Sequence, residues 1–376
     1  MKFTFDRDAM IKEISIAQEV IANKSPVSIL SNILLIAENN TLTIKALSSF
    51  VNFTTRIPID VQEEGSTIIY CDKFMSILSS LPSGEVDFLQ EDIDVTIKPI
   101  AKRFKAKLKS QTSDKFPEFG DSNNVPFFEV PASEFKEMIK QTSFAVSTDP
   151  NKFFMTGCYL TKAGDDFVMV ATDGRRLSCC TKKGLNIPDF ESAIINTKIL
   201  GLVFKHAPDE GNIQLSVIES TLFVKFANVE FQSALINGKY PNYTHVIPQN
   251  LTHSFQVNKE DFDSALKRTT IMINKKDSRL ILKIRPGELE LLCPESDTGE
   301  ANEIIPCRYD GPNCTTGLNY SYLLDPLKVI ESEDVVFEFN FNEPSVDGEE
   351  ETIRKALLIH GTDSSDYIHV IMPMIQ

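Results

Sequence analysis

The sequence predicts an α+β fold built from three tandem copies of one unit, each with two helices and a largely antiparallel sheet. The first observation is an internal repeat: residues 128–146 read FEVPASEFKEMIKQTSFAV and residues 255–273 read FQVNKEDFDSALKRTTIMI, a short alternating strand followed by an amphipathic helix. The same pattern opens the chain at residues 3–10, FTFDRDAM. The second observation is length, because the 376 residues divide into thirds of about 125 residues, an ordinary domain size.

The first third begins with a strand at residues 3–5 and a helix near residues 8–22, along which Met10 and Ile14 recur at helical spacing. A second helix is predicted over residues 72–81, with Asp72 as its N-cap and an end before Pro82. Alternating runs predict the remaining strands of this third, at residues 33–37, 42–46, 52–59, 86–89 and 95–98.

The other two thirds follow the same plan. The middle third has its second helix near residues 197–206, and the last third has helices near residues 261–273 and 322–330. Segments rich in Pro, Gly, Asn and Asp at residues 114–126 and 248–250 are typical of linkers. We therefore expect three domains, which cover residues 1–126, 127–249 and 250–376.

The net charge of −15 is concentrated in the last third, since residues 1–126 carry −3, residues 127–249 carry −1 and residues 250–376 carry −11. An acidic chain is a poor general binder of nucleic acid, because neutralisation of phosphates supplies most of the non-specific affinity. Any contact with DNA would require lysines that are segregated onto one face. Taken alone, the acidity favours simple solubility as its explanation.

The seven cysteines are odd in number and include no Cys-x-x-Cys pair, which favours reduced thiols over disulfides or a zinc site. The first 20 residues lack the continuous apolar core of a signal peptide. No stretch approaches the ~18 uninterrupted apolar residues of a membrane span. These observations predict a cytoplasmic protein without a membrane partner.

Residues 102–109, KRFKAKLK, carry the sharpest charge feature of the chain. In a strand, Phe104, Ala106 and Leu108 would lie on one face and the basic side chains on the other. One interpretation is an edge strand that its lysines protect from aggregation. The other is an electrostatic docking edge for an acidic partner, which the acidic last third slightly favours.

Candidate catalytic residues are sparse. His360, Asp363 and Asp366 could suggest a metal cluster, but the turn-forming residues between them favour a hairpin. The sequence has no phosphate-binding G-x-x-x-x-G-K-[ST] loop and no G-x-S-x-G elbow. We therefore expect no enzymatic activity, no metal and no cofactor. Two alternatives stay open: an enzyme or ligand-binding repeat protein with a cofactor site between units, and a repeat scaffold that binds only proteins.

Three segments stand out, and they read ATDGRRLS at residues 171–178, YPNYTHVIP at residues 240–248 and VIMPMIQ at residues 370–376. The last is unusually apolar for a chain end, and methionines suit surfaces that accept differently shaped apolar partners. In this order, and together with the threefold repeat, the segments resemble the bacterial DNA polymerase III beta subunit family, the beta sliding clamps. The resemblance covers the whole chain.

The resemblance implies the DNA clamp fold and a non-catalytic processivity subunit, which encircles double-stranded DNA without sequence specificity and tethers the polymerase. A domain of this size has a radius of gyration of about 14 Å and, as a uniform sphere, is roughly 36 Å across. Three such spheres leave too small a hole for a duplex roughly 20 Å wide, whereas six leave enough room. Each chain would therefore form half of a closed ring, a head-to-tail homodimer. The implied partners are the DNA polymerase III catalytic subunit, the clamp loader, and other polymerases and repair factors that bind through short linear motifs.

The charge asymmetry and the resemblance together predict the dimer contact. The basic edge near residue 103 of one chain would meet acidic groups of the other chain's last domain around an apolar centre. The predicted interface set is Arg103, Lys105, Lys107, Leu108, Ile271, Met272, Glu300 and Glu303.

Contact with DNA is expected from helices that line the hole, because a flexible lysine contacts phosphates without reading bases. Lys24 and Lys73 match the family. Helix placement alone adds Lys12, Lys136, Lys140, Lys198, Lys205, Lys267 and Arg268. For any one of these residues, a solvated helix face is an equally good interpretation.

The three segments map onto the family's partner pocket, which accepts short peptides with a glutamine and apolar or aromatic anchors. The resemblance implies that Arg176 frames the cleft and that four residues bury the anchor, namely Leu177, Val246, Val370 and Met372. The whole matched set is Met155, Thr172, Gly174, Arg175, Arg176, Leu177, Pro241, His245, Val246, Val370, Ile371, Met372, Pro373 and Met374. His245 stands where arginine is common in the family and Arg175 where histidine is common, so the peptide preference stays open.

Overall fold

The computed structural model describes residues 1–21, 28–120, 122–273, 278–296, 299–341, 351–363 and 366–374. Contacts between residues group the chain into two compact units. The first contains residues 1–136 and 187–236, and the second contains residues 137–186 and 237–376. This grouping divides the residues of the expected middle domain between the two units, and the three domain boundaries stay a prediction.

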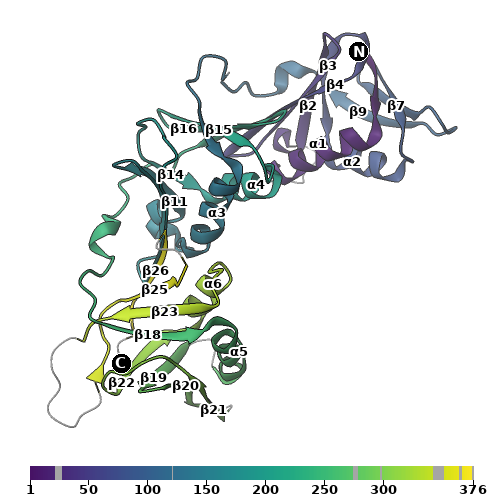
Figure 1. Cartoon of the computed structure of the whole chain (residues 1–376). Coiled ribbons are helices and arrows are strands. Elements are labelled where there is room, and N and C mark those ends of the chain that lie inside the picture. Colours follow the sequence, from purple (N-terminus) through teal and green to yellow (C-terminus); the bar gives the residue numbers. More distant parts are fainter. Residues whose placement is uncertain are drawn as a thin grey trace. The chain divides into compact units, whose positions relative to one another are not determined.

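Each predicted third opens with a strand that runs directly into a helix (Figure 1). These pairs are β1 (Lys2–Asp6) with α1 (Arg7–Val20), β10 (Phe128–Pro131) with α3 (Ala132–Thr142), and β18 (His253–Asn258) with α5 (Lys259–Thr269). A second such pair follows in each third: β6 (Gly65–Tyr70) with α2 (Cys71–Ser80), β14 (Ala193–Asn196) with α4 (Thr197–His206), and β22 (Cys314–Asn319) with α6 (Tyr320–Leu327). The predicted two-helix plan is therefore confirmed in every third.

In four of the six pairs, the last strand residue, an Asp or Asn, caps the helix with its side chain. Asp6 accepts hydrogen bonds from the backbone N–H groups of Asp8 and Ala9, and Asn258 accepts them from Glu260 and Asp261. Asn and Asp suit this position because their short side chains satisfy N–H groups that have no partner within the helix.

The predicted N-cap at Asp72 is wrong. The N-cap of α2 is Tyr70, which makes no side-chain cap bond, and Asp72 lies inside the first helical turn. There Asp72 accepts a hydrogen bond of 2.8 Å from Gln18 of α1. The helix dipole favours an acidic residue in the first turn of a helix. An Asp in the first turn therefore gives nearly the same sequence pattern as an Asp at the N-cap.

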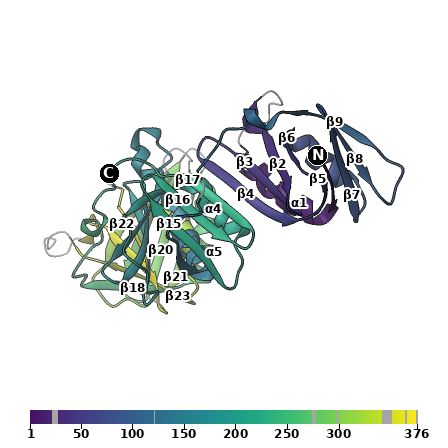
Figure 2. The ribbon, with the colours of Figure 1, turned by 90° about the horizontal axis from the view of Figure 1, so that it is seen from above.

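The first unit contains one long sheet with the order β10-β15-β16-β17-β4-β3-β2-β6-β9-β8-β7-β1-β5. Figure 2 shows β2, β3 and β4 of this sheet near α1. The strands not yet located are β2 (Asn32–Glu38), β3 (Thr41–Leu47), β4 (Val51–Pro58), β5 (Asp60–Glu63), β7 (Glu85–Glu91), β8 (Asp94–Pro99), β9 (Ala106–Gln111), β15 (Asn212–Ile218), β16 (Thr221–Phe226) and β17 (Val229–Ala234). The predicted strands of the first third are thus confirmed.

The second unit contains two sheets. One runs β11-β12-β13-β26-β25-β23-β18, and the other runs β21-β20-β19-β22-β24. Their strands are β11 (Gly157–Ala163), β12 (Asp166–Thr172), β13 (Arg176–Lys182), β19 (Arg279–Arg285), β20 (Glu288–Ser296), β21 (Gly299–Pro306), β23 (Asp334–Phe339), β24 (Glu351–Thr352), β25 (Leu357–Gly361) and β26 (Tyr367–Ile371). Short 3₁₀ helices complete the elements of the described residues: η1 (Ile29–Ser31), η2 (Ser113–Lys115), η3 (Ser143–Ala145), η4 (Pro150–Met155), η5 (Tyr243–His245) and η6 (Thr270–Met272).

The repeat extends into the packing of the core. Phe3 lies opposite Phe88 in the ladder of β1 and β7, and their rings stack with centroids 4.5 Å apart. Phe255 lies opposite Phe337 in the ladder of β18 and β23, and their rings stack at 4.6 Å. All four rings are fully or almost fully buried. A cross-strand aromatic pair is therefore one of the features that the first and last thirds share.

The basic segment differs from its prediction. Residues 102–105 precede the strand, and β9 begins only at Ala106. β9 lies between β6 and β8, yet β6 pairs only with Ser110 and Gln111. Among the described residues, one edge of residues 106–109 therefore has no strand beside it, and both interpretations of a lysine-rich edge stay possible.

The expected hairpin near His360 is confirmed, because β25, which contains His360, pairs antiparallel with the next strand, β26. All seven cysteines are free and buried. None of the helices in the described part of the chain is long and apolar enough to cross a membrane.

Candidate functional site

The second unit brings two of the three distinctive segments into direct contact. β13 pairs with β12 on one side and with β26 on the other, so Leu177 lies opposite both Thr172 and Val370. Beyond the end of β26, the backbone N–H of Met372 donates a hydrogen bond of 2.9 Å to the carbonyl of Arg175. The ATDGRRLS turn and the apolar C-terminal segment are therefore neighbours.

The third segment packs on the same sheet through its tyrosines. The ring of Tyr240 stacks on that of Tyr159 in β11, with centroids 4.8 Å apart, and its hydroxyl donates to the carbonyl of Val170. The ring of Tyr243 is also close, with its centroid 6.2 Å from that of Tyr159. Burial raises the pKa of Tyr240 above its ordinary value, so the hydroxyl stays protonated as a donor.

Local hydrogen bonds fix the turn between β12 and β13. The carboxylate of Asp173 accepts the backbone N–H groups of Arg175 and Arg176 at 2.8 and 3.1 Å. The Thr172 hydroxyl donates to the Arg176 carbonyl at 2.6 Å and accepts the N–H of Gly174 at 3.1 Å. Gly174 has a φ of +89°, a backbone conformation that favours glycine. The ATDGR sequence thus specifies a rigid turn.

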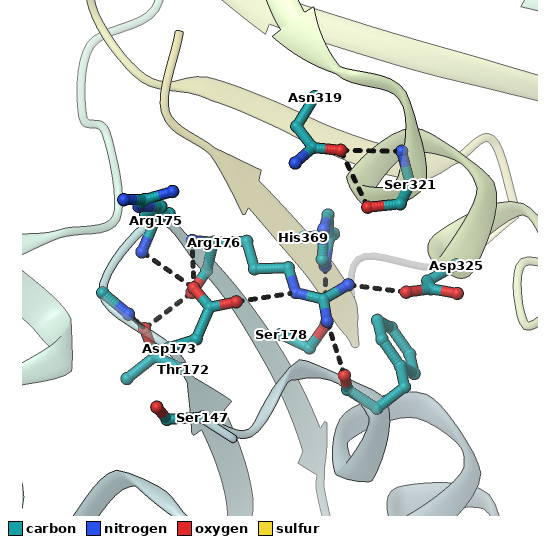
Figure 3. A network of polar contacts seen from close by, with 12 residues as sticks. Ser147, Thr172, Asp173, Arg175, Arg176, Ser178, Asn319, Ser321, Asp325 and His369 are labelled. Carbon is teal, nitrogen blue, oxygen red and sulfur yellow. Dashed lines mark hydrogen bonds and ion pairs between the residues drawn. The ribbon is translucent and has the colours of Figure 1, made fainter. Parts of the chain in front are cut away.

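Arg176 connects this turn to two other elements (Figure 3). Its guanidinium donates to the Asp173 carboxylate at 3.2 Å, to the Asp325 carboxylate of α6 at 2.6 Å and to the Phe144 carbonyl of η3 at 2.7 Å. The guanidinium also lies 4.5 Å from the ring centroid of Tyr322. The side chain is almost wholly enclosed, so its first role here is to hold the turn, α6 and η3 together.

The groups around Arg176 have fixed charge states. Burial raises the pKa of Asp325, but hydrogen bonds from Lys328 and Arg176 outweigh burial, and the pKa lies below its ordinary value. Burial, with a further contribution from Arg176, lowers the pKa of His369 to about 3. The imidazole is therefore neutral at physiological pH, and its Nδ1 lies 2.6 Å from the Ser178 hydroxyl.

The apolar residues predicted for the pocket divide into two groups by exposure. Leu177 and Val370 are completely buried, whereas Val246 and Met372 are 42% and 43% exposed. Of these four residues, only Val246 and Met372 present apolar surface to a ligand in this conformation. His245 lies at the end of η5 and contacts Asn242 at 3.1 Å. Ile371 is buried, whereas Pro373 and Met374 are half-buried.

Sequence reasoning missed several residues of this network: Asp173, Phe144, Tyr322 and Asp325. Asp173 lies inside the recognised motif, and its spacing to Arg175 and Arg176 is that of a turn in which an Asp side chain accepts nearby N–H groups. Asp325 gives no such signal, because it lies 149 residues away from Arg176 in the sequence.

The residues predicted for the dimer interface are mostly exposed. Ile271 is 74% exposed, and Arg103, Lys105, Lys107 and Glu300 are also exposed. Leu108 and Met272 are half-buried. Glu303 differs, because it forms an ion pair with Arg268 of α5, which lowers the pKa of Glu303. One residue predicted for the dimer thus pairs with one predicted for DNA.

Most of the lysines predicted to face DNA already have partners. Lys198 donates to the Val20 carbonyl at the end of α1, and Lys136 donates to the Ala207 carbonyl after α4, where a positive charge is favoured. Lys205, Lys140 and Lys267 pair with carboxylates. Lys12 and Lys73 are exposed, and the described residues give them no ion pair. Lys24 lies outside the described residues.

A metal centre finds no support in the described part of the chain, where no three His, Cys, Asp or Glu residues are grouped to hold an ion. Burial raises the pKa values of Cys158 and Cys180 to about 12 and those of Cys179 and Cys307 to about 11. These thiols are therefore poor nucleophiles, because the thiolate is the reactive form.

Comparison with known proteins gives matches along the whole chain. Family models described as the N-terminal, central and C-terminal domains of the DNA polymerase III beta subunit match residues 1–119, 129–242 and 244–375. The "Beta sliding clamp" of Treponema pallidum is 36% identical over 379 residues, which cover 100% of this chain and 99% of the relative. That of Pseudomonas aeruginosa is 28% identical over 379 residues, with 100% of both chains covered.

Solved structures agree with these matches. The DNA polymerase III subunit beta from Pseudomonas aeruginosa superposes with a TM-score of 0.92 at 26% identity, over 100% of both chains. A sliding clamp from the same organism, bound to griselimycin, gives the same TM-score, identity and coverage.

Proposed function

Because the chain belongs to the bacterial DNA polymerase III beta subunit family, the beta sliding clamps, we propose that two copies close into a ring around duplex DNA and tether the replicative polymerase. The observation that carries this proposal is the match of all three family domains, in order, along the chain. The match leaves no part of the sequence larger than a short linker to supply a different activity. We infer that the protein is a non-catalytic processivity factor that acts in the cytoplasm, where bacterial DNA is replicated.

Two strand edges support closure of the ring. Among the described residues, the edge of β9 at residues 106–109 has no strand beside it. In the same part of the chain, β21 pairs only with β20 and so ends its sheet. A free strand edge offers backbone donors and acceptors to another chain. We propose that β9 of one copy adds to β21 of the other, which would continue the sheets across the contact.

Charge and apolar surface fit the same pairing. Lys105 and Lys107 are exposed at or beside β9, and Glu300 is exposed on β21. Ile271 follows α5 with 74% of its surface exposed, so it offers apolar surface that a partner would cover. The contact would therefore combine an apolar centre with complementary charges at its rim.

Binding of DNA would rest on unpaired lysines of the helices. Lys12 of α1 and Lys73 of α2 are the best candidates, because both are exposed and the two helices pack together through Gln18 and Asp72. Lys198 and Lys136 are weaker candidates, since helix-end carbonyls already occupy them. Few free charges would give weak and salt-sensitive binding, which suits a ring that slides.

The rigid surface around Arg176, Val246 and Met372 is the proposed partner site. Its exposed apolar side chains could receive the anchors of a short extended peptide from polymerases, the clamp loader or repair factors. Leu177 and Val370 would contribute only if the overlying side chains moved. The similar clamp from Pseudomonas aeruginosa binds griselimycin, so competition between griselimycin and a partner peptide can be measured on this chain.

The decisive experiment compares nicked circular DNA with the same DNA after linearisation. A topological ring, assembled with a clamp loader, stays on the circle through gel filtration in high salt and leaves once the circle is cut. Equal loss from circular and linear DNA would contradict the proposal. Retention that is lost at high salt, equally on circular and linear DNA, would indicate ordinary electrostatic binding instead.

A further inference from the structure

The segment between β9 and β10, residues 112–127, lies on the sheet of the first unit and is called the strap below. It contains η2 and most of the tract that the sequence marks as the first linker, and all of it except residue 121 is described. Connections longer than about 12–15 residues are uncommon in compact domains unless they have a function or are disordered. The contacts of the strap therefore indicate whether it does more than connect two strands.

The first half of the strap is anchored on strands of the first third. Phe116 is buried in a small apolar cluster. The other buried members of this cluster come from β2, β3 and β6 and are Leu34, Leu47 and Ile68. Phe119 packs against the same cluster, with its ring centroid 6.5 Å from that of Phe116. The strap thus belongs to the packing of the first third at this end.

The second half of the strap is anchored on β16 and β17, which belong to the middle third. The side chain of Gln232 in β17 is 6% exposed and donates a hydrogen bond of 2.6 Å to the carbonyl of Gly120. The ring of Phe127 lies edge-on to that of Phe223 in β16, with centroids 6.5 Å apart. Nζ of Lys225, also in β16, lies 4.5 Å from the centroid of the Phe127 ring.

Between the two anchored regions lies the ladder of β4 and β17, where a strand of the first third pairs with a strand of the middle third. We call this ladder the seam. It extends from the pair Val51–Ser233 to the pair Thr55–Val229. Because the strap is fixed on both sides of the seam, it cannot keep all its contacts if the two strands separate.

The strap covers the face of the seam that lies opposite α1. Successive side chains of a strand point to opposite faces of the sheet. The hydroxyl of Thr55 donates to the carboxylate of Glu13 in α1 at 2.7 Å, so Thr55 faces the helix. Thr54 therefore points to the other face, as does its ladder partner Lys45. Nζ of Lys45 lies 5.0 Å from the ring centroid of Phe119, which places the strap on that face.

The helix-side face of the same joint is held by contacts between α1 and α4. Nζ of Lys198 donates to the carbonyl of Val20 at 2.5 Å, and Lys205 pairs with Glu19 at 2.7 Å. The joint is thus bonded on both faces of the sheet, by two helices on one side and by the strap on the other.

We propose that the strap is a clasp that keeps the seam closed, so that the strands of the first third and β15–β17 move as one body. Its hydrogen bond to Gln232 and its contact with Lys45 exist only while the strap spans the closed seam. Contacts made in only one of two states shift the equilibrium towards that state. The clasp belongs to the single chain, whether or not two copies close into a ring.

The test is amide hydrogen exchange of the full-length protein, followed by mass spectrometry on peptides from β4 and β17. The release variant Phe119→Ala with Gln232→Ala removes contacts of the strap at the seam and leaves Phe116 in its cluster. Exchange in β4 and β17 should become about tenfold faster, as expected from the loss of one hydrogen bond and one cation–π contact. Exchange in β7 and β8 of the same unit should stay within about twofold of the wild type.

Phe204→Ala with Gln62→Ala is the matched control, because it removes the same two kinds of side chain from the first unit away from the strap. Phe204 is 41% exposed on α4, and the exposed Gln62 donates to Asp60 at 2.7 Å. The control should leave exchange in β4 and β17 within about twofold of the wild type. Equal acceleration in the control and the release variant would overturn the proposal, and so would unchanged exchange at the seam in the release variant.

Urea unfolding of the same variants separates a local effect from a general one. Faster exchange confined to β4 and β17, with the free energy of unfolding nearly unchanged, supports the clasp. Faster exchange in every strand of the unit, with an equal fall in the free energy of unfolding, would show that the strap supports the whole unit. That result would contradict a specific role at the seam.

Discussion

Replacement of Arg176 by alanine tests whether its network holds the second unit together. The substitution removes hydrogen bonds to Asp173, Asp325 and the Phe144 carbonyl. It leaves the poorly exposed Asp173 without its cation, whereas Asp325 keeps its ion pair with Lys328. Removal of one partner from a buried ion pair costs about 3–5 kcal/mol. Because both carboxylates keep some contact with water, we expect the lower end, about 3 kcal/mol.

For a cooperative unit of 150–250 residues, each kcal/mol shifts the melting temperature by about 2–4 °C. Arg176→Ala should therefore lower the melting temperature of the second unit by about 6–12 °C in differential scanning calorimetry. Arg308→Ala is the control, since this exposed arginine of the same unit makes a single ion pair of 3.7 Å and should change stability by less than about 1 kcal/mol.

The same variant should change the dependence of stability on pH. The folded-state pKa of Asp325 lies below its ordinary value, so its contribution is complete above the unfolded pKa of about 3.9 and is lost as the pH falls through the folded pKa. In Arg176→Ala, the loss of stability as the pH falls should be smaller than in the wild type. If Arg176→Ala melts within about 2 °C of the wild type and loses stability at acid pH as the wild type does, the network does not hold the unit together.

Three further predictions test the caps, the thiols and the dimer edge. Asn258→Ala should cost about 1 kcal/mol in urea unfolding because two N–H groups of α5 lose their acceptor, and an effect no larger than that of the exposed control Ser254→Ala would refute this role. The folded chain should react slowly with Ellman's reagent at pH 8 and show seven thiols only in denaturant, since all the cysteines are buried; rapid reaction of several thiols would contradict that burial. Charge reversal of Arg103 and Lys105 to glutamate should shift sedimentation towards monomer, whereas Lys98→Glu should not, and an unchanged dimer in the first variant would argue against the proposed edge.

Local sequence was sufficient wherever the responsible interactions are short in range. The strand–helix pairs were predictable because apolar periodicity selects each element. In addition, the capping side chains of Asp6 and Asn258 bond backbone N–H groups only two and three residues further along the chain. The rigid ATDGR turn follows the same logic, since Asp173 bonds the next two N–H groups that it can reach. Asp72 shows the limit, because a cap and a first-turn residue give nearly the same local pattern.

The family, the threefold repeat and the identity of the three distinctive segments were determined by the sequence itself, because each is a pattern along the chain. Only the tertiary structure decided that Leu177 and Val370 are buried while Val246 and Met372 are exposed. It also decided that the Lys198 side chain bonds a carbonyl at the end of α1 and that Arg176 pairs with Asp325. The physical reason is that burial and charge pairing depend on which distant residues the fold brings together, and no local pattern records those distances.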